Sequence, residues 1–304
     1  MGSMDLLDPK LDVVFKMLFA DRQNRRLLES LLTAVLRPPS PIANITVLDP
    51  DLPKDLASDR GVRLDVLVEL ADGTLVDVEM ECDARRAHGE RWLYQWARLF
   101  GGRLRRGDKY EKLEPVVCIV FLDARTESRR FHSVYEAREV HDHSQLCDAL
   151  AVHVVELPRV EQATIEGEPL DLQRWARFLR VDDERALESL ASETPIMAEA
   201  KHALEILSRE PSAQRIAEIR REAEIARRLD RAEDLAQGRE EGEATGTVKG
   251  LRKGVEALCK ALGIELVGTR LAELESWNAQ QLQTALDSLA NRRVWPPNDS
   301  EERK

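Results

Sequence analysis

The chain has 304 residues, is 43% hydrophobic and carries a formal net charge of −11. Its length and apolar content are enough for one domain of about 180 residues with an appended region. No apolar run approaches the ~20 residues that a membrane helix needs and no signal peptide is visible, so a membrane protein is not expected. The four cysteines are scattered singly without a Cys-x-x-Cys motif, which favours a cytoplasmic location and argues against a disulfide framework.

Two amphipathic helices are predicted near the N-terminus. Residues 12–19 and 24–36 both place apolar side chains at intervals of three and four, the period of a helix with one buried face. Pro38 and Pro39 end the second segment. Both helices need a partner layer, which the following segment can supply.

A β-hairpin is predicted from residue 62 to residue 82. Apolar and polar residues alternate over 62–70 and 74–82. The intervening Ala71-Asp72-Gly73 suits a three-residue loop, because glycine tolerates the left-handed conformation that such loops need. With this loop, Leu70 pairs with Thr74. One face of the hairpin is then expected to hold Leu64, Val66, Val68, Leu70, Val76, Val78, Met80 and Cys82.

The other face of the hairpin carries four acidic residues, Asp65, Asp77, Glu79 and Glu81. The register places Asp65 opposite Glu79, with Cβ atoms ~5 Å apart. Two facing carboxylates repel each other unless a cation lies between them, and Mg²⁺ is commonly held by one or two carboxylates with water and phosphate oxygens. The alternative is a solvated acidic face, and a one-residue slip in the loop would separate the pair.

A basic segment follows the hairpin. Residues 85–112 contain nine Lys or Arg and three acidic residues. Within it, residues 91–100 predict an amphipathic helix that Gly101 and Gly102 end. Its core side holds Trp92, Trp96, Leu99 and Phe100, and its opposite stripe holds Arg91, Gln95 and Arg98. The two tryptophans are interpreted as core rather than as a platform for stacking bases.

The order of predicted elements indicates an α/β fold. Residues 116–122 form an unbroken apolar run, which is typical of a strand covered on both faces. The chain therefore reads helix, helix, strand, strand, helix, strand. This order predicts a mixed sheet flanked by helices.

Several of these segments together resemble the PD-(D/E)XK nuclease family transposases, also called recombination-promoting nucleases. The motifs are the box from Asp8-Pro9-Lys10 to Phe19, the strand Leu64-Asp65-Val66, and the strand Val78-Glu79-Met80-Glu81. The arginine-flanked helix and the segment from Trp175 to Leu179 are also similar, so the resemblance spans roughly residues 5–260. It implies a restriction-endonuclease-like fold and hydrolysis of phosphodiester bonds in DNA that depends on Mg²⁺ or another divalent cation.

The resemblance assigns roles to the acidic residues. Asp65 and Glu79 would be the metal ligands, and Glu81 occupies the position where nucleases of this fold usually have lysine and this family commonly has glutamine. An anion at that position would repel the attacked phosphate unless it binds a second ion or pairs with Arg63. Arg91 or Arg98 would then take over the electrostatic role of the lysine, unless the stripe is an ordinary solvated helix face. The predicted catalytic set is Asp65, Glu79, Glu81 and Arg91.

The remaining basic residues are predicted to contact DNA phosphates, in a manner independent of base sequence. They are Arg85, Arg86, Arg98, Arg103, Arg105, Arg106 and Lys109. A solvated basic loop is the alternative interpretation. The His141-Asp142-His143 segment is interpreted as a surface loop, because no third ligand follows at zinc spacing.

The composition predicts three regions: a nuclease-like domain over residues 5–180, a charged helical region over 181–262 and a small helical tail over 263–292. In the second region glycine recurs every fourth residue from Gly238 to Gly254. Each glycine costs a helix up to ~1 kcal/mol, which indicates either a flexible arm or a helix in close contact with a partner. The C-terminal helices are expected to support either self-association into a homo-oligomer or docking to a partner.

Three functions remain open on these grounds. The first is a metal-dependent DNA endonuclease of the recombination-promoting type. The second is a catalytically inactive protein of the same fold that binds DNA or a protein, which Glu81 and the net charge favour. The third is a structural protein that assembles through its glycine-repeat helix.

Overall fold

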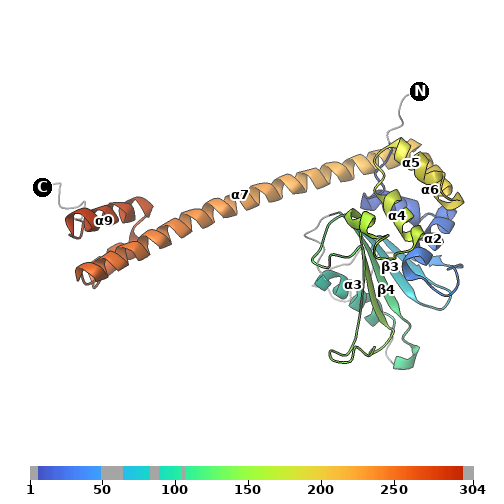
Figure 1. Cartoon of the computed structure of the whole chain (residues 1–304), viewed down its shortest axis with the longest axis horizontal. Coiled ribbons are helices and arrows are strands. Elements are labelled where there is room, and N and C mark those ends of the chain that lie inside the picture. Colours follow the sequence, from blue (N-terminus) through green and yellow to red (C-terminus); the bar gives the residue numbers. More distant parts are fainter. Residues whose placement is uncertain (1–5, 49–63, 83–88, 105–106, 297–304) are drawn as a thin grey trace. The chain divides into compact units, whose positions relative to one another are not determined.

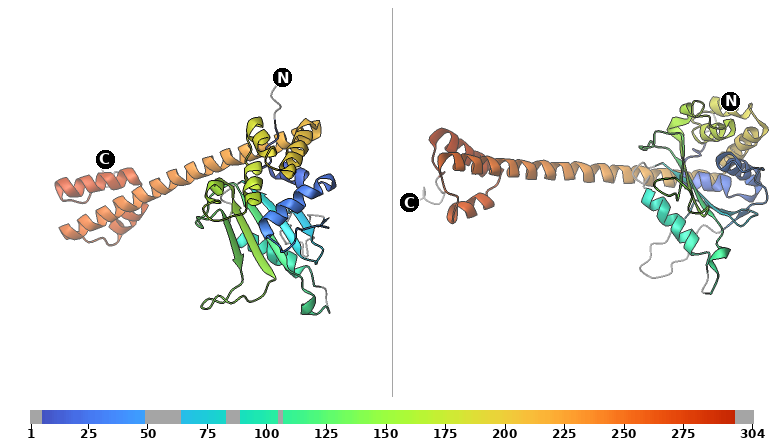
Figure 2. Two further views of the ribbon diagram at one scale, coloured as in Figure 1. Left: turned by 45° about the vertical axis from the view of Figure 1, so that its right-hand side comes forward. Right: turned by 60° about the horizontal axis from the view of Figure 1, so that its bottom comes forward.

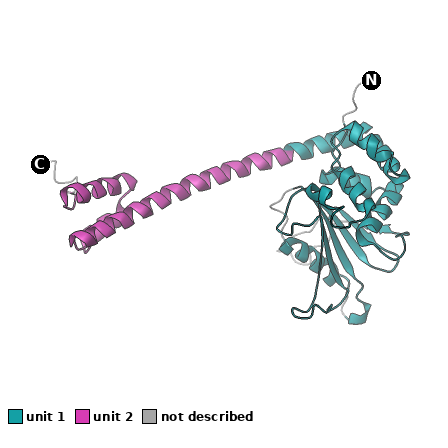
Figure 3. Ribbon diagram, in the orientation of Figure 1, with its two compact units in different colours: residues 1–222 teal, residues 223–304 magenta. Residues whose placement is uncertain are grey.

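The computed structural model describes residues 6–48, 64–82, 89–104 and 107–296. The chain divides into two compact units, Met1–Glu222 and Ala223–Lys304 (Figure 3). The first unit holds the β-sheet with helices around it, and the second is helical (Figure 1).

Two helices form at the N-terminus as the periodicity predicts. They are α1 (Asp12–Phe19) and α2 (Arg25–Leu36), with a short 3₁₀ turn, η1 (Arg22–Asn24), between them. Arg37 ends α2 in the left-handed conformation, with φ 51°, and its N–H donates to the Thr33 carbonyl at 3.0 Å. The left-handed end stops the helix before the two prolines.

Within the described residues, six strands form one mixed sheet in the order β1-β2-β3-β4-β6-β5. Their bounds are β1 Thr46–Val47, β2 Val66–Glu69, β3 Leu75–Glu81, β4 Val116–Leu122, β5 His132–Glu136 and β6 Leu150–Glu156. The central strands β3, β4 and β6 are parallel, and the other neighbours are antiparallel. This sheet with its flanking helices confirms the predicted α/β class.

The hairpin register is the predicted one. Val66 faces Val78 across β2 and β3, and the Leu70 N–H donates to the Thr74 carbonyl at 2.9 Å. Gly73 has φ +87°, and an added Cβ would lie 2.3 Å from the Glu114 carboxyl group. Glycine is therefore favoured in this loop for two reasons: it adopts the positive φ without strain, and it leaves room for the Glu114 carboxyl group.

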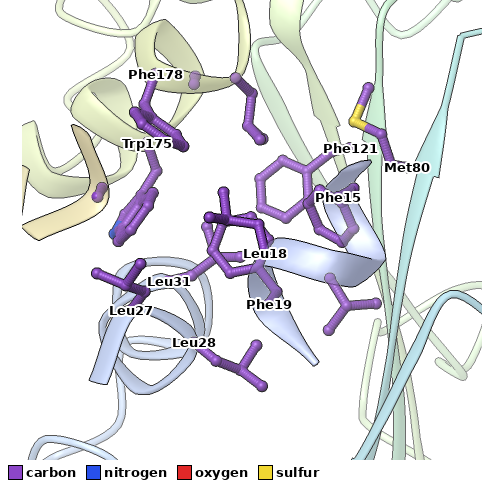
Figure 4. Packing of buried hydrophobic residues seen from close by; sticks show 14 of the residues in the cluster. Phe15, Leu18, Phe19, Leu27, Leu28, Leu31, Met80, Phe121, Trp175 and Phe178 are labelled. Carbon is purple, nitrogen blue, oxygen red and sulfur yellow. The ribbon is translucent and has the colours of Figure 1, made fainter. Parts of the chain in front are cut away.

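The apolar face of the sheet packs against helices from both ends of the first unit. These are α1, α2 and three later helices, α4 (Leu170–Leu179), α5 (Glu184–Ala191) and α6 (Pro195–Arg209). Figure 4 shows Phe15 of α1 beside Phe121 of β4, with ring centroids 6.2 Å apart. The rings of Phe19 and Trp175 are 5.7 Å apart, which joins α1 to α4.

The opposite face of the sheet is covered by α3 (Gly89–Gly101), which lies on the other side of the strands in Figure 2. Trp92 is buried there against Cys118 and Val120, so its interpretation as a core residue is correct. Leu64 also packs on this side, with Leu67 and Leu99, rather than with Val66 as expected. The strand begins at Val66, so Leu64 precedes it and does not follow its alternation.

The core of the first unit continues beyond residue 180, where the sequence predicts the end of the nuclease-like domain. Leu187 of α5, Met197 and Leu204 of α6 and Ala213 are all buried in the same cluster as the α1 and α2 side chains. The helix α7 (Pro211–Leu262) starts in this unit, where the Arg220 guanidinium donates to Asp12 Oδ1 at 2.7 Å. Short 3₁₀ turns complete the fold, η3 (Tyr110–Lys112) and η4 (Leu157–Gln162).

The second unit is helical. It contains the rest of α7 together with α8 (Thr269–Ser276) and α9 (Ala279–Arg292), around a core of Val255, Cys259, Leu274, Leu282 and Leu289. The glycine repeat is helical throughout, and an added Cβ at Gly254 would lie 3.2 Å from Leu286 of α9. The close contact at Gly254 is therefore with α9 of the same chain, not with a partner molecule. Among the described helices, none has the length and apolar character required to cross a membrane.

Candidate active site

Asp65 and Glu79 lie side by side at the end of the hairpin. The Asp65 N–H donates to Glu79 Oε1 at 3.1 Å, and the Met80 N–H donates to Asp65 Oδ2 at 2.9 Å. Each carboxylate is thus held by the backbone of the neighbouring strand. The predicted opposition of the two side chains is confirmed, and the acidic face is not solvated, because Glu79 is only 5% exposed.

Arg91 at the start of α3 lies beside two of the acids. Its Nη1 is 2.5 Å from Glu81 Oε2 and its Nη2 is 3.4 Å from Glu79 Oε2. At this position of the arginine stripe, Arg91 therefore forms ion pairs and is not an ordinary solvated side chain. The proposed partner of Glu81, Arg63, lies outside the described residues, and Arg91 pairs with Glu81 in the structure.

Gln95 is a site residue that sequence reasoning placed on the polar stripe of the helix without a role. It is 4% exposed, one turn after Arg91, and its side chain donates a hydrogen bond to Glu79 that partly opposes the rise in the Glu79 pKa caused by burial. Residues four apart on a helix share a face. The spacing therefore places Arg91 and Gln95 on one face of α3, but it does not indicate that this face lies against the acidic strand.

Asp77 is fully buried on β3, on the same face as Glu79. Its Oδ1 has no hydrogen-bond partner among the described residues, and its Oδ2 is 3.9 Å from the thiol of Cys118. A buried carboxyl oxygen without a partner is costly, and such atoms commonly mark the place of a water or an ion.

The pKa values of Asp65, Asp77 and Glu79 are all raised. Burial, followed by the charge of Glu79, raises the pKa of Asp65 to about 8. Burial also raises the pKa of Glu79, although Arg91 opposes the shift, and it raises the pKa of Asp77 well above its usual value. The site therefore disfavours several uncompensated negative charges at once.

The donor set fits a hard divalent cation. Among the described residues, no three His, Cys, Asp or Glu side chains are arranged to hold a metal ion. Mg²⁺ does not require such a cage, because it is often held by one or two carboxylates and completes its shell with water and phosphate oxygens. Asp65 and Glu79 supply two such donors, and the unpartnered Asp77 oxygen supplies a further acceptor nearby.

The predicted phosphate-contact residues have different outcomes. Arg85, Arg86, Arg105 and Arg106 lie outside the described residues. Lys109 is exposed before η3, and Arg98 is half-buried on α3 at the edge of a cavity of about 840 Å³. The side chain of Arg103 is only 15% exposed and pairs with Glu69 and Glu114, which makes it a less accessible phosphate contact than Lys109. His141 and His143 are exposed in a loop, as predicted.

The sheet order, the helices on both faces and the neighbouring carboxylates of Asp65 and Glu79 define a protein of the restriction-endonuclease-like class. Residues 9–233 match the family model described as PD-(D/E)XK nuclease family transposase. Because the match covers most of the chain, the protein belongs to this family. Neither a curated protein nor a solved structure matches it. Nucleases of this kind generally use divalent metal ions and act on DNA.

Proposed function

We propose that this protein is a Mg²⁺-dependent DNA endonuclease of the recombination-promoting type. The observation that carries the proposal is the pair of neighbouring carboxylates, Asp65 and the buried Glu79, each held by a backbone N–H of the opposite arm of the hairpin. Their raised pKa values favour protonation or a counter-ion, and a divalent cation supplies the stronger compensation.

In this proposal the protein holds the carboxylates of Asp65 and Glu79 close together, so that one cation can bind both. The Met80 and Asp65 N–H groups orient the Asp65 and Glu79 side chains, and Gln95 supports Glu79. A bound divalent ion would supply an activated water and would neutralise charge on the attacked phosphate and on the leaving oxygen.

Arg91 would supply the positive charge that related nucleases place two residues after the metal-binding glutamate. Its guanidinium compensates Glu81, so the anion at that position does not repel an approaching phosphate. The phosphate-contact residues proposed for the DNA backbone are Lys109 and Arg98 with Arg85, Arg86, Arg105 and Arg106.

A catalytically inactive DNA- or protein-binding protein of the same fold is the second candidate. Arg91 favours it, since one guanidinium already compensates Glu79 and Glu81 without a cation. The two candidates differ in what Glu81→Gln should do. An active enzyme should keep a similar rate, whereas an inactive one should gain activity because the substitution frees Arg91 and removes a negative charge.

Nicking of a supercoiled plasmid in Mg²⁺ tests the proposal. Asp65→Asn and Glu79→Gln should each abolish nicking and leave the circular dichroism spectrum unchanged. Asp148→Asn is the matched control, because Asp148 is exposed and lies outside the site. Wild-type activity in Asp65→Asn would defeat the assignment of this residue as a ligand.

A further inference from the structure

The loop between β4 and β5, residues 123–131, runs along the edge of the sheet where the acidic residues of β3 lie. Strands β3, β4 and β6 are parallel, so their carboxyl ends share this edge. The Asp123 N–H donates to the Glu81 carbonyl at 2.9 Å, which places the start of the loop beside the end of β3. The Phe131 carbonyl accepts from the Glu156 N–H at 2.8 Å, at the end of β6. The loop therefore crosses the ends of β4 and β6.

The loop carries three exposed arginines, Arg125, Arg129 and Arg130. The only acid among residues 124–130 is Glu127, so this stretch has a charge of 3 − 1 = +2. Within the described part of the chain, Arg125 and Arg129 form no ion pair, and Arg130 has Glu166 at 3.9 Å. In a chain of net charge −11, the loop is thus a local positive surface that nearby acids leave largely uncompensated.

The backbone of the loop is ordered although its arginines are exposed. The Thr126 hydroxyl donates to Glu156 Oε1, and the Thr126 carbonyl accepts from Arg159 Nη2 at 3.2 Å. The Phe131 N–H donates to Glu166 Oε2 at 3.1 Å, and the Phe131 ring is fully buried. An ordered backbone loses little conformational entropy when a ligand binds. The arginines are therefore presented from a preorganised surface.

The extent of the loop along the edge suits the spacing of phosphates in DNA. The loop ends at β5, which is three strands away from β3 in the sheet. Because neighbouring strands lie about 4.8 Å apart, the loop covers about 5 to about 14 Å from β3. One DNA strand carries a charge every ~3.4 Å along its axis, so this distance corresponds to about four nucleotides. Arginine forks match phosphate oxygens in geometry and charge.

We propose that the loop 123–131 binds the phosphate backbone of DNA through Arg125 and Arg129, next to the phosphodiester at Asp65 and Glu79. The inference rests on the proposed function, because it takes DNA to be the molecule that reaches the carboxylates. It adds a binding surface separate from the basic segment that follows the hairpin. Phosphate contacts do not read base sequence, so the loop strengthens binding to any duplex.

Fluorescence anisotropy of a labelled DNA duplex in chelator tests this surface. Arg125→Gln/Arg129→Gln should raise the Kd about tenfold and make the dependence of log Kd on log salt shallower by about 1 to 2, since two phosphate contacts are lost. Arg22→Gln/Arg185→Gln is the matched control, because it removes the same charge from exposed positions on η1 and α5. Arg125→Lys/Arg129→Lys should keep most of the affinity, since lysine also binds phosphate.

Equal Kd values and salt slopes in the wild type and the loop glutamine variant would overturn the inference. An equal loss in the loop variant and the control would also overturn it, because net charge alone would then explain the change. Plasmid nicking by the same proteins separates this inference from the proposed function. Weaker binding by the loop variant, with no nicking by the wild type, would retain the surface and remove the endonuclease. Nicking by the wild type, with unchanged binding by the loop variant, would do the reverse.

Discussion

Glu79 accepts a hydrogen bond from the backbone N–H of Asp65 at 3.1 Å, so the two acids are joined through the main chain as well as facing each other. This contact exists only in the register that the three-residue loop sets. The position of the two carboxylates is therefore a property of the hairpin backbone, which side-chain substitutions should leave in place.

The contribution of Asp65 to the stability of the cation-free protein should fall as the pH rises from about 4 to about 8. The pKa of Asp65 rises from an ordinary value of 3.8 to about 8 on folding. Within that window the folded state keeps a proton that the unfolded state has released, so each increase in pH favours unfolding. Above about 8 the contribution is already lost. Thermal unfolding in a chelator between about pH 5 and about pH 8 measures this slope.

The same measurement on Asp65→Asn provides the control for that slope. Asparagine does not titrate, so the fall in Tm with pH should be shallower than in the wild type. Addition of Mg²⁺ to the wild type should also reduce the fall, because a cation favours the ionised carboxylate. Parallel curves for the two proteins in chelator would show that Asp65 is not the titrating group.

Arg91→Met should reduce the free energy of unfolding by about 1 to 3 kcal/mol, since Glu79 and Glu81 would keep their burial without a counter-ion. The expected loss is smaller than for a fully buried pair, because Arg91 is partly exposed. Urea unfolding measures it, with Arg177→Met on α4 as an exposed control. Adding Glu81→Gln should recover part of the loss, and no recovery would argue against this pairing.

Gly73→Ala should destabilise the first unit by about 1 to 2 kcal/mol. Gly73 has φ +87°, which a residue with Cβ adopts only with strain, and the Glu114 carboxyl group occupies the space of the new atom. Gly89→Ala is the control, because nothing lies near its missing Cβ. A similar change in urea midpoint for both variants would contradict the role of the loop.

Two glycines of the repeat should respond in opposite directions. Gly246→Ala should stabilise α7 by up to about 1 kcal/mol, because nothing lies near an added Cβ and alanine favours the helix. Gly254→Leu should destabilise the second unit, since even a Cβ would lie 3.2 Å from Leu286. Thermal unfolding of the full chain checks both. Equal changes in Tm for the two variants would show that Gly254 has no packing role.

Local patterns predicted the elements near the site well. The alternation over 62–82 and the loop glycine were sufficient for the register, and the helices α1, α2 and α3 follow their periodicity. The strands β1 and β5 were missed, because β1 has only two residues and β5 mixes buried His132 with exposed Tyr135. Neither pattern alternates enough to indicate a strand.

Tertiary relationships were harder to predict. The burial of Gln95 and the pairing of Arg91 with Glu81 depend on how α3 lies across the sheet, which no local pattern encodes. The pairing of His132 with His153 joins two strands in antiparallel register, and neither strand signals its partner. Ion pairing of Arg103 with Glu114 likewise depends on the fold around the hairpin loop.

The three-residue loop at Ala71-Asp72-Gly73 has a practical consequence for engineering this protein. Deleting or duplicating one loop residue would turn every acid of one strand toward the aliphatic core. Epitope tags, fluorophores and circularly permuted ends therefore belong elsewhere, for example at the exposed tip around His141, where lengthening the chain leaves the pairing of β5 with β6 intact.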